Sequence, residues 1–273
     1  MKGWMSVKIG FIGCGNMGGA LACAVIKELG SENVFVFDTD TKKMKDFASR
    51  NEANVSDIEY IASNCDYIFL GVKPQVISAV LENVSPFLEE RITDFTLVSM
   101  AAGVSLSQIA SSLSEECSVI RIMPNIPAKV GDGVILYCAN EFTSNNQKDV
   151  FVGFMKEAGL VDEIDENKID AASCISGCGP AFAFMFIEAL ADGGVECGLP
   201  RDKAMLYAAK MLAGSAEMVI KSGEHPGALK DAVCSPAGST IEGVKALENG
   251  AFRSLAMNAV RASFDRTKEL GKK

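Results

Sequence analysis

Short apolar runs alternate with helical apolar patterns along the first half of the chain. A β-rich run at 7–13 precedes helical spacing over 16–30, and a second run at 33–38 precedes a helical pattern at 41–50. Polar helical segments separate the strand patterns that follow, at 67–72, 96–102, 118–123 and 133–139. A helix near 144–158 completes the series. This alternation predicts an α/β fold with a doubly wound parallel sheet.

Strand patterns largely give way to helical spacing from about residue 166 onward. Helices are expected at roughly 167–174, 180–197, 200–221, 239–249 and 251–270. The helix over 180–197 is apolar around nearly its whole circumference, so it needs cover on all sides. A purely helical region offers little of that cover, and a second copy of the chain is expected to supply it. The pattern therefore predicts a dinucleotide-type sheet domain at 1–165 and an all-helical dimerisation domain at 166–273.

Composition and charge exclude several classes of function. The chain has 273 residues, of which 48% are hydrophobic and 22% charged, as in ordinary globular proteins. Its net charge of −9 argues against nucleic acid, which is held through clustered Lys and Arg. The nine cysteines form no C-x-x-C pair and the chain holds one histidine, so no metal site is expected.

The cysteines, the amino end and the most apolar stretch indicate the cellular compartment of the protein. The cysteines mostly lie inside apolar patterns as reduced thiols, and the amino end shows no signal-peptide stretch. Both features predict a cytoplasmic protein. The most apolar stretch, 180–194, contains Glu188 and Asp192, and it is expected to fall short of a membrane span.

The first turn of the predicted sheet carries a cofactor motif. "GCGNMG" (13–18) gives G-x-G-x-x-G between a strand and a helix. Gly13 permits the tight turn, Gly15 lets a pyrophosphate approach the backbone, and Gly18 lets helix and strand pack closely. Free N–H groups at the helix start face the phosphates. Asp38 closes the second strand 25 residues after Gly13. This context favours a dinucleotide site over the alternative in which the glycines serve packing alone.

Asp38 also bears on the choice of cofactor. A carboxylate at this position accepts hydrogen bonds from the adenine ribose hydroxyls and repels a 2′-phosphate, which favours NADH over NADPH. Lys42 and Lys43 are close enough in sequence to pair with a phosphate, and Asp38 could instead cap the next turn. "GVKPQ" (71–75) lies at the carboxyl edge of the sheet, where Lys73 contacts cofactor or substrate or is simply solvated.

Two turns in the second half resemble anion sites. "SPAGST" (235–240) runs into a helical pattern, so the N–H groups of 238–240 are unpaired at a helix start and suit a carboxylate. Ser239 and Glu242 also have the spacing of a capping box, which would satisfy those donors internally. The residues themselves leave both interpretations open. "SGCGP" (176–180) combines a helix-start proline with small residues that leave room for a ligand.

Taken together, these motifs resemble the pyrroline-5-carboxylate reductase family. The resemblance runs from about residue 7 to 270 and rests on "GFIGCGNMG" (10–18), "FLGVKP" (69–74), "AAGVS" (101–105), "RIMPNIPAKVGDG" (121–133), "SGCGPAFAF" (176–184), "ALADGGVECGLPR" (189–201), "HPGALKDAVCSPAGSTI" (225–241) and "GAFRSL" (250–255). It implies a Rossmann-type doubly wound sheet followed by an all-helical dimerisation domain. It also implies reduction of 1-pyrroline-5-carboxylate, an imino acid, to L-proline with NADPH or NADH, in a homodimer or a larger oligomer.

The resemblance further implies which residues form the site. Cofactor contacts are expected at Ile12, Gly13, Cys14, Gly15, Asn16, Met17, Gly18, Asp38, Gly71, Val72, Lys73, Pro74, Met100, Ala101 and Ala102. Substrate contacts are expected at Glu166, Ser176, Gly177, Cys178, Gly179, Gly238, Ser239 and Thr240. The backbone N–H groups of 238–240 would hold the substrate carboxylate. The hydroxyl of Thr240 would lie near the ring nitrogen, as the catalytic residue.

Four positions depart from the usual family pattern. Cys178 replaces a Ser, Phe182 a Tyr, Ala237 a Gly, and Ser239 a Thr or Ala. These changes affect side-chain contacts more than backbone contacts.

The chemistry explains why the chain has no obvious acid–base apparatus. A protonated C=N bond is already an electrophile, so positioning and exclusion of water suffice. His225 is accordingly expected to be a structural or capping residue, and Cys174 and Cys178 to serve packing. Two alternatives remain: an oxidoreductase acting on a six-membered cyclic imine or a β-hydroxy acid, and a dinucleotide-sensing protein without turnover.

Overall fold

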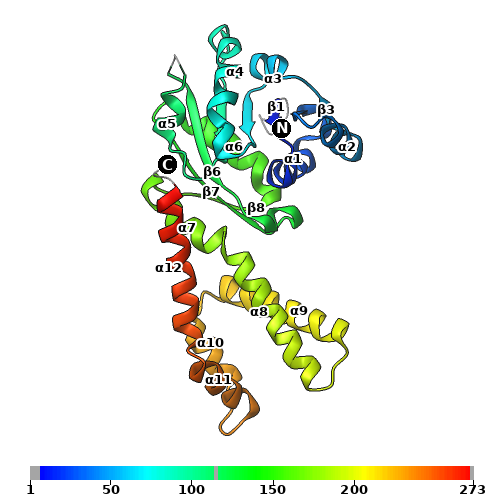
Figure 1. The fold of residues 1–273 in the computed structure, drawn as a ribbon, viewed down its shortest axis with the longest axis vertical. Coiled ribbons are helices and arrows are strands. Elements are labelled where there is room, and N and C mark those ends of the chain that lie inside the picture. The colour runs from blue at the N-terminus through cyan, green and yellow to red at the C-terminus, as the bar shows by residue number, and fades with distance from the viewer. Residues whose placement is uncertain (1–6, 114–115, 271–273) are drawn as a thin grey trace. The chain divides into compact units, whose positions relative to one another are not determined.

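The chain folds into two compact units. The computed structural model describes residues 7–113 and 116–270, and Figure 1 follows them from the blue to the red end of the chain. The first unit runs to Cys178 and includes the end of the last helix from Phe264, and the second is Gly179–Ser263. The outermost residues of both predicted domains, and the amino end used to predict location, lie outside the described residues. The predicted boundary at 165/166 stays a prediction.

An eight-stranded sheet forms the centre of the first unit. Its order is β3-β2-β1-β4-β5-β6-β7-β8. The strands are β1 (Ile9–Ile12), β2 (Val34–Phe37), β3 (Asn54–Val55), β4 (Tyr67–Leu70), β5 (Thr96–Ser99), β6 (Ser118–Met123), β7 (Gly133–Ala139) and β8 (Gly159–Glu163). Because β1 pairs with both β2 and β4, the strand order reverses beside β1, where ligands bind in such sheets. The doubly wound fold is confirmed.

One pair of strands departs from the predicted parallel arrangement. β6 and β7 are antiparallel, with Ile120 opposite Ala139, whereas β7 and β8 are parallel. The connection between β6 and β7 holds only the short 3-10 helix η3 (Ile126–Val130). A parallel crossover needs a dozen or more residues, so this connection can only reverse the chain. The expectation of a wholly parallel sheet was wrong at this edge.

Helices cover both faces of the sheet, as Figure 1 shows. They are α1 (Asn16–Leu29), α2 (Thr41–Asn51), α3 (Ile58–Asn64), α4 (Ile77–Glu89), α5 (Leu106–Ala110), α6 (Asn145–Met155) and α7 (Glu166–Ser176), with 3-10 turns η1 (Ser31–Asn33), η2 (Pro74–Val76) and η4 (Lys156–Ala158). One core layer stacks Phe11 on Phe69 at 4.4 Å, with Phe151 and Phe154 of α6 beside them. The other includes Leu81 of α4. Burial on both faces explains the continuous apolar runs of the strands.

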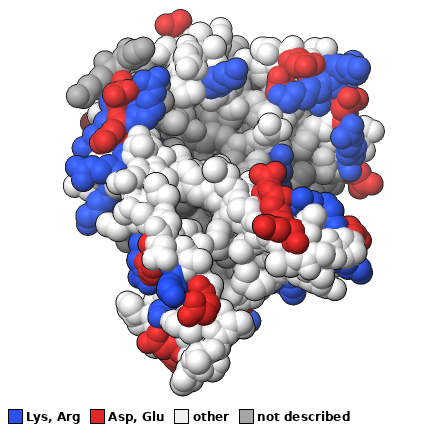
Figure 2. Space-filling model, turned by 60° about the horizontal axis from the view of Figure 1, so that its bottom comes forward, with Lys and Arg blue, Asp and Glu red and all other residues white. Residues whose placement is uncertain are grey.

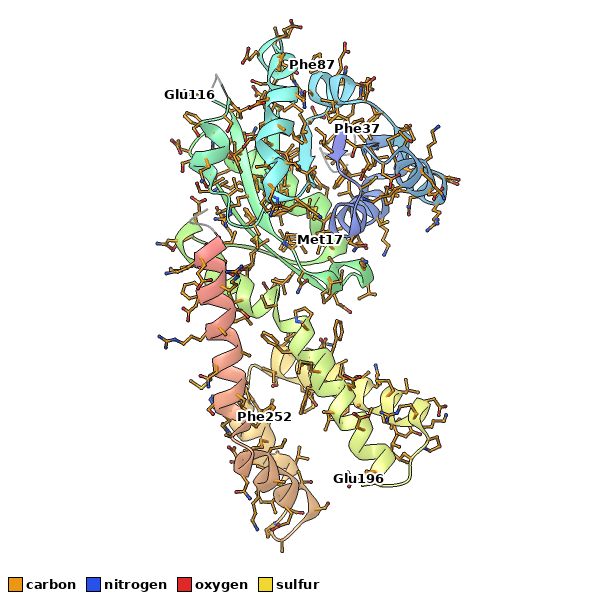
Figure 3. All side chains as sticks on the ribbon, in the orientation of Figure 1. Met17, Phe37, Phe87, Glu116, Glu196 and Phe252 are labelled. Atoms are coloured by element: carbon orange, nitrogen blue, oxygen red, sulfur yellow. The ribbon has the colours of Figure 1, made fainter. Side chains whose placement is uncertain are left out.

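The second unit is entirely helical. It contains α8 (Gly179–Glu196), α9 (Arg201–Ser222), α10 (Pro226–Val233), α11 (Ser239–Asn249) and most of α12 (Phe252–Leu270). Phe252, labelled at the start of α12 in Figure 3, packs on Phe186 of α8, and the ring centroids are 5.5 Å apart. The predicted helices are confirmed. α10 was not predicted, because it is short and begins at a proline.

The helical unit leaves much apolar surface uncovered in a single chain. Only Ala191 of α8 is fully buried. Exposed large side chains include Phe184, Met185, Leu206, Tyr207, Met218, Ile220, Leu255 and Met257. Figure 2 shows one face of the molecule with broad areas free of Lys, Arg, Asp and Glu. Apolar surface of this extent marks an interaction surface.

The apolar helical run is longer than the sequence indicated. Residues Glu166–Glu196, which comprise α7, a turn and α8, contain an 18-residue window with a mean hydropathy of 1.6, and by length and composition alone they could cross a membrane. This corrects the expectation that the stretch falls short of a span. Only 11% of the apolar window is buried within the chain, so it needs a covering surface, which a second protein chain supplies as well as lipid does.

Candidate cofactor and substrate sites

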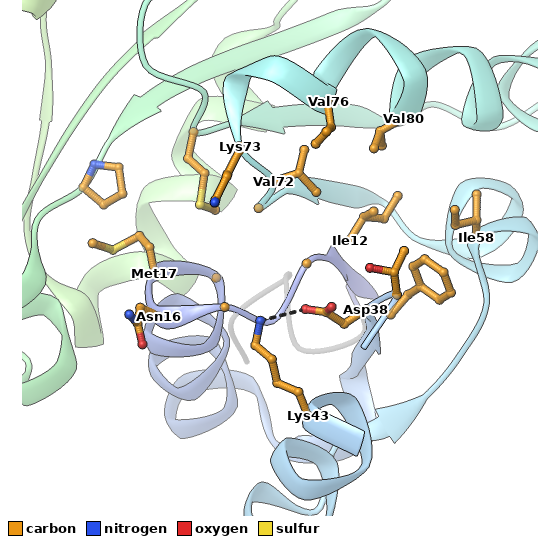
Figure 4. Close-up of a pocket in the computed structure, with 18 of the residues that line it drawn as sticks. Ile12, Asn16, Met17, Asp38, Lys43, Ile58, Val72, Lys73, Val76 and Val80 are labelled. Carbon is orange, nitrogen blue, oxygen red and sulfur yellow. Dashed lines mark hydrogen bonds and ion pairs between the residues drawn. The ribbon is translucent and has the colours of Figure 1, made fainter. Parts of the chain in front are cut away.

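A cleft of about 770 Å³ lies beside β1 and β4, where the strand order reverses (Figure 4). Most of the predicted cofactor residues line it: Ile12, Gly13, Gly15, Asn16, Met17, Gly18, Asp38, Gly71, Val72, Lys73 and Met100. The side chains of Asn16, Met17, Lys73 and Val72 border the same opening in Figure 4. Cys14, Pro74, Ala101 and Ala102 do not line the cleft, and their contacts with a cofactor stay predictions.

The three glycines of the first turn have different physical roles. Gly13 has a φ of +101°, and a Cβ there would lie 2.5 Å from the carbonyl oxygen of Gly71. A Cβ at Gly18 would collide with the carbonyl oxygen of Gly13. At Gly15, by contrast, a Cβ would meet only Nζ of Lys43, at 3.5 Å. Gly13 and Gly18 therefore allow close packing, whereas Gly15 leaves open space toward the cleft.

The start of α1 is arranged to hold an anion. Gly15 is the N-cap residue, and no side chain of the described residues caps the helix. The first N–H groups of a helix have no intrahelical partner and carry a partial positive charge. Together with the space above Gly15, these donors fit the pyrophosphate of a dinucleotide. The predicted cofactor turn is consistent with this geometry.

Asp38 stands at the end of β2 with most of its acceptor capacity in use. Its Oδ2 accepts hydrogen bonds from the N–H of Cys14 at 3.0 Å and from Nζ of Lys43 at 3.1 Å, and its Oδ1 accepts from the N–H of Asp40 at 3.0 Å. Burial alone would raise the pKa of this carboxyl group, but the hydrogen bonds from Asp40, Lys43 and Cys14 outweigh it and lower the pKa. Asp38 is therefore ionised at neutral pH.

The structure shows which residue caps α2. Asp40, not Asp38, is the N-cap of α2, since its side chain accepts from the N–H of Lys43. Asp38 instead braces the turn before the helix. The neighbouring Cys14 thiol has its pKa raised to about 11, first by burial and then by the charge of Asp38, so it stays un-ionised.

The second predicted turn leads into α11. Gly238 is the N-cap, and among the described residues no side chain caps this helix. The capping box considered from the sequence does not form: with Gly238 as N-cap, Glu242 falls one position beyond the place from which it could reach back. Glu242 pairs instead with Lys245, at 3.3 Å. The helix start is therefore left available to an anion.

One of the three predicted amide donors is already engaged. The N–H of Gly238 donates to the carbonyl oxygen of Ser235 at 3.0 Å. Because this N–H is already used in a turn bond, its predicted contact with the substrate carboxylate, like those of Ser239 and Thr240, stays a prediction. The donors left for a carboxylate are those of Ser239 and Thr240. Thr240 itself is exposed.

Ala237 lies within this turn in a strained conformation. Its φ is +55°, in the left-handed region that favours glycine. The resemblance noted from the sequence led to an expectation of glycine at this position. The substitution therefore places a Cβ where the backbone path of the turn disfavours one.

Glu166 lies in the first unit, at the start of α7. Its Oε1 accepts from the N–H of Leu106 at 2.7 Å and from Nη1 of Arg121 at 3.4 Å. Arg121 is 3% exposed and also binds Asp170 of α7 at 2.7 Å. These bonds fasten α7 to β6 and α5. Glu166 does not line the cofactor cleft, and its role as a substrate contact stays a prediction.

The turn at the end of α7 is held by a residue that the sequence did not reveal. The side-chain amide of Asn125 donates to the carbonyl oxygen of Ser176 at 2.8 Å, while its Oδ1 accepts from the N–H of Val134 at 2.9 Å. Met123 and Pro124, just before Asn125, line the cofactor cleft. Gly177 and Cys178 follow Ser176 directly, and Gly179 begins α8. The substrate contacts expected at these four positions stay predictions.

The histidine and the thiols behave as structural residues. Nδ1 of His225 accepts a hydrogen bond from the N–H of Gly227 at 3.0 Å and caps α10, which confirms the capping role expected for it. All nine cysteines are free. The thiol of Cys174 donates to the carbonyl oxygen of Asp170 at 3.1 Å, within its own helix.

The fold, the glycine turn and the cleft define a Rossmann-type oxidoreductase that uses NAD(P)H. Residues 166–270 match the family profile described as pyrroline-5-carboxylate reductase dimerisation, and residues 8–103 match the profile of NADP oxidoreductase, coenzyme F420-dependent. The chain belongs to the pyrroline-5-carboxylate reductase family, as its motifs predicted.

Similarity to individual proteins extends over the full chain. This chain is 37% identical to the pyrroline-5-carboxylate reductase of Escherichia coli, and the match covers 98% of this chain and 100% of that protein. With the enzyme of Methanosarcina acetivorans the identity is 40%, over 97% and 98%. The crystal structure of Plasmodium falciparum pyrroline carboxylate reductase with NADP bound superposes with a TM-score of 0.87 at 34% identity, covering 98% of this chain and 99% of that one.

The family assignment accounts for the uncovered apolar surface. The dimerisation profile spans α7 to α12, the helices that carry the exposed side chains of the second unit. Self-association is thus a property of this region, as the pattern of 180–197 predicted. The dimerisation profile begins at residue 166, whereas the compact units part between Cys178 and Gly179.

Proposed function

We infer that the chain reduces 1-pyrroline-5-carboxylate to L-proline with NADH or NADPH, the last step of proline biosynthesis. When bound, the nicotinamide supplies a hydride to the carbon of the protonated C=N bond. The chain binds and orients the reactants rather than moving protons, which agrees with a histidine that is engaged as a helix cap.

One observation carries the substrate assignment. α11 starts without a side-chain cap, although Glu242 stands close by and pairs elsewhere. The uncapped N–H groups of Ser239 and Thr240 hold the carboxylate of the substrate, and the helix dipole favours its negative charge. The hydroxyl of Thr240 lies near the ring nitrogen and fixes the orientation of the ring. Ser176, Gly177, Cys178 and Gly179 are further proposed substrate contacts.

The cofactor is held at the start of α1. The uncapped N–H groups there bind the pyrophosphate above Gly15, and Asp38 accepts from the adenine ribose. Lys73 and Met17 border the cleft at its other end in Figure 4 and orient the remainder of the dinucleotide.

The reductase works in the cytoplasm as a homodimer or a larger oligomer. Nine free thiols suit a reducing compartment. The net charge of −9 disfavours nucleic acid. A partner chain, rather than a membrane, covers the apolar helices of the second unit, since the dimerisation profile coincides with them.

An assay of cofactor oxidation tests the function. The purified chain is mixed with NADH or NADPH and one of three substrates: the five-membered imine carboxylate, its six-membered homologue, or a β-hydroxy acid with the oxidised cofactor. We expect the highest kcat/KM on the five-membered imine. A higher value on another substrate would assign the chain to a different reaction, and cofactor binding without any turnover would make it a sensor.

A further inference from the structure

We propose that Lys43 determines how well the cofactor cleft accepts the 2′-phosphate that distinguishes NADPH from NADH. The inference deepens the proposed function, because it concerns the cofactor of that reaction. It assigns to Lys43 the role of neutralising Asp38 and, at the same time, of binding the phosphate that Asp38 alone would repel.

The position of Lys43 supports both roles. Its Nζ lies 3.1 Å from Oδ2 of Asp38, and 3.5 Å from the place that a Cβ on Gly15 would occupy. The ammonium group therefore lies close to both the end of β2 and the glycine turn, and the dashed line in Figure 4 marks its ion pair with Asp38. Its side chain is 45% exposed, so it is accessible to a ligand.

Lys43 also borders a second hollow, which is lined by Cys14, Gly15 and Asn16 of the glycine turn. This hollow measures about 610 Å³ and shares Gly15, Asn16 and Lys43 with the cofactor cleft. Its charged lining consists of four cations against two carboxylates: Lys42, Lys43, Arg50 and Lys129 against Asp40 and Asp46. A local excess of positive charge is notable in a chain of net charge −9, and it suits a phosphate monoester.

Asp38 leaves little room for the alternative in which it alone selects NADH. A carboxylate offers about four acceptor sites. On Oδ2, the N–H of Cys14, the ammonium group of Lys43 and, at 3.6 Å, the thiol of Cys14 already donate, and on Oδ1 the N–H of Asp40 does. One acceptor remains, on Oδ1, for a single ribose hydroxyl. An ammonium group has three donors, so Lys43 keeps its bond to Asp38 while donating a second to a phosphate oxygen.

Binding of the oxidised cofactors tests the inference without any imine. NADP⁺ and NAD⁺ differ only in the 2′-phosphate, and calorimetry gives both dissociation constants for the wild type and for Lys43→Met. We expect the substitution to raise the dissociation constant of NADP⁺ about tenfold relative to that of NAD⁺. This is the effect expected from the loss of one charge-assisted hydrogen bond. Lys43→Arg, which keeps the charge, should hold the ratio within about threefold of the wild type.

Lys45→Met is the matched control. Lys45 is an exposed residue of the same helix that borders neither hollow, and its loss changes the net charge equally. This variant should leave the ratio unchanged. If Lys43→Met weakens the binding of both nucleotides equally, or of neither, the inference is wrong while the proposed function stands. If the wild type binds neither nucleotide, the proposed function itself fails.

Discussion

The side-chain amide of Asn125 donates to the carbonyl oxygen of Ser176 at 2.8 Å, across 51 residues of sequence. Asn125 is 6% exposed, and its other amide atom accepts from the backbone of β7. The segment that precedes it lines the cofactor cleft, and Ser176 ends the helix that leads into the predicted substrate turn. One buried side chain thus connects the backbone of the two regions.

Replacing Asn125 by Ala should impair catalysis more than cofactor binding. The variant loses the bond that fixes the end of α7, so we expect kcat/KM for the imine to fall about tenfold, as loss of one positioning hydrogen bond does. The dissociation constant of NADP⁺ should change less than about twofold. Steady-state kinetics and calorimetry provide the two values.

Asn140→Ala is the control for a general loss of stability. Asn140 also makes partly buried hydrogen bonds, with the backbone N–H of Val119 and the carbonyl oxygen of Cys117, but it does not line the cofactor cleft. It should lower the free energy of unfolding as much as Asn125→Ala and keep kcat/KM. Equal losses of activity in the two variants would show that Asn125 has no positioning role.

Ala237→Gly should stabilise the protein. It relieves a φ of +55°, so the free energy of unfolding should rise by up to about 1 kcal/mol, even after the entropy that glycine adds to the unfolded chain. Urea denaturation measures the change. Ala246→Gly, in the interior of α11, should instead lower it by about 1 kcal/mol. A loss at both positions would mean that the turn carries no strain.

Gly15→Ala and Gly18→Ala should separate binding from packing. A methyl group at Gly15 meets no backbone and its φ of −66° is ordinary, so stability should stay within about 0.5 kcal/mol while NADP⁺ binding falls at least about tenfold. At Gly18 the added group collides with Gly13, and we expect a loss of about 1–3 kcal/mol of stability besides the loss of binding. Intact nucleotide binding in Gly15→Ala would place the pyrophosphate elsewhere.

Asp38→Ala should weaken the use of NADH more than that of NADPH. The variant loses the ribose acceptor, but it frees Lys43 for the 2′-phosphate. Paired kcat/KM values with the two cofactors measure the ratio. Ser144→Ala, which removes the N-cap of α6, a helix with no residue in the cleft, is the control for stability. An unchanged ratio would leave Asp38 as a residue of the turn alone.

The sequence predicted most of the fold because its signals are local. Strands buried on both faces read as continuous apolar runs, and this located β1, β2, β4, β5, β6 and β7. β3 has two residues and β8 is a partly polar edge strand, so neither produces such a run. The orientation of β7 depends on the length of the connection before it, which apolar periodicity does not record.

At the sites, too, local features could be predicted from the sequence, whereas contacts between distant residues could not. The separate roles of Gly13, Gly15 and Gly18 follow from a local motif and match the geometry. The prediction of a capping box was wrong because it took Ser239 as the N-cap. The N-cap is Gly238, and Ser239 is the first residue of the helix. Asn125 could not be found, because its partner is distant in sequence and an asparagine in a loop carries no signal of what it binds.

A crystal structure with NADP⁺ and a five-membered ring carboxylate such as proline tests the central claim most directly. We expect the carboxylate to lie within hydrogen-bond distance of the backbone N–H groups of Ser239 and Thr240, with the Thr240 hydroxyl beside the ring nitrogen. A ligand bound elsewhere, with the start of α11 capped by the protein's own side chains, would contradict the account.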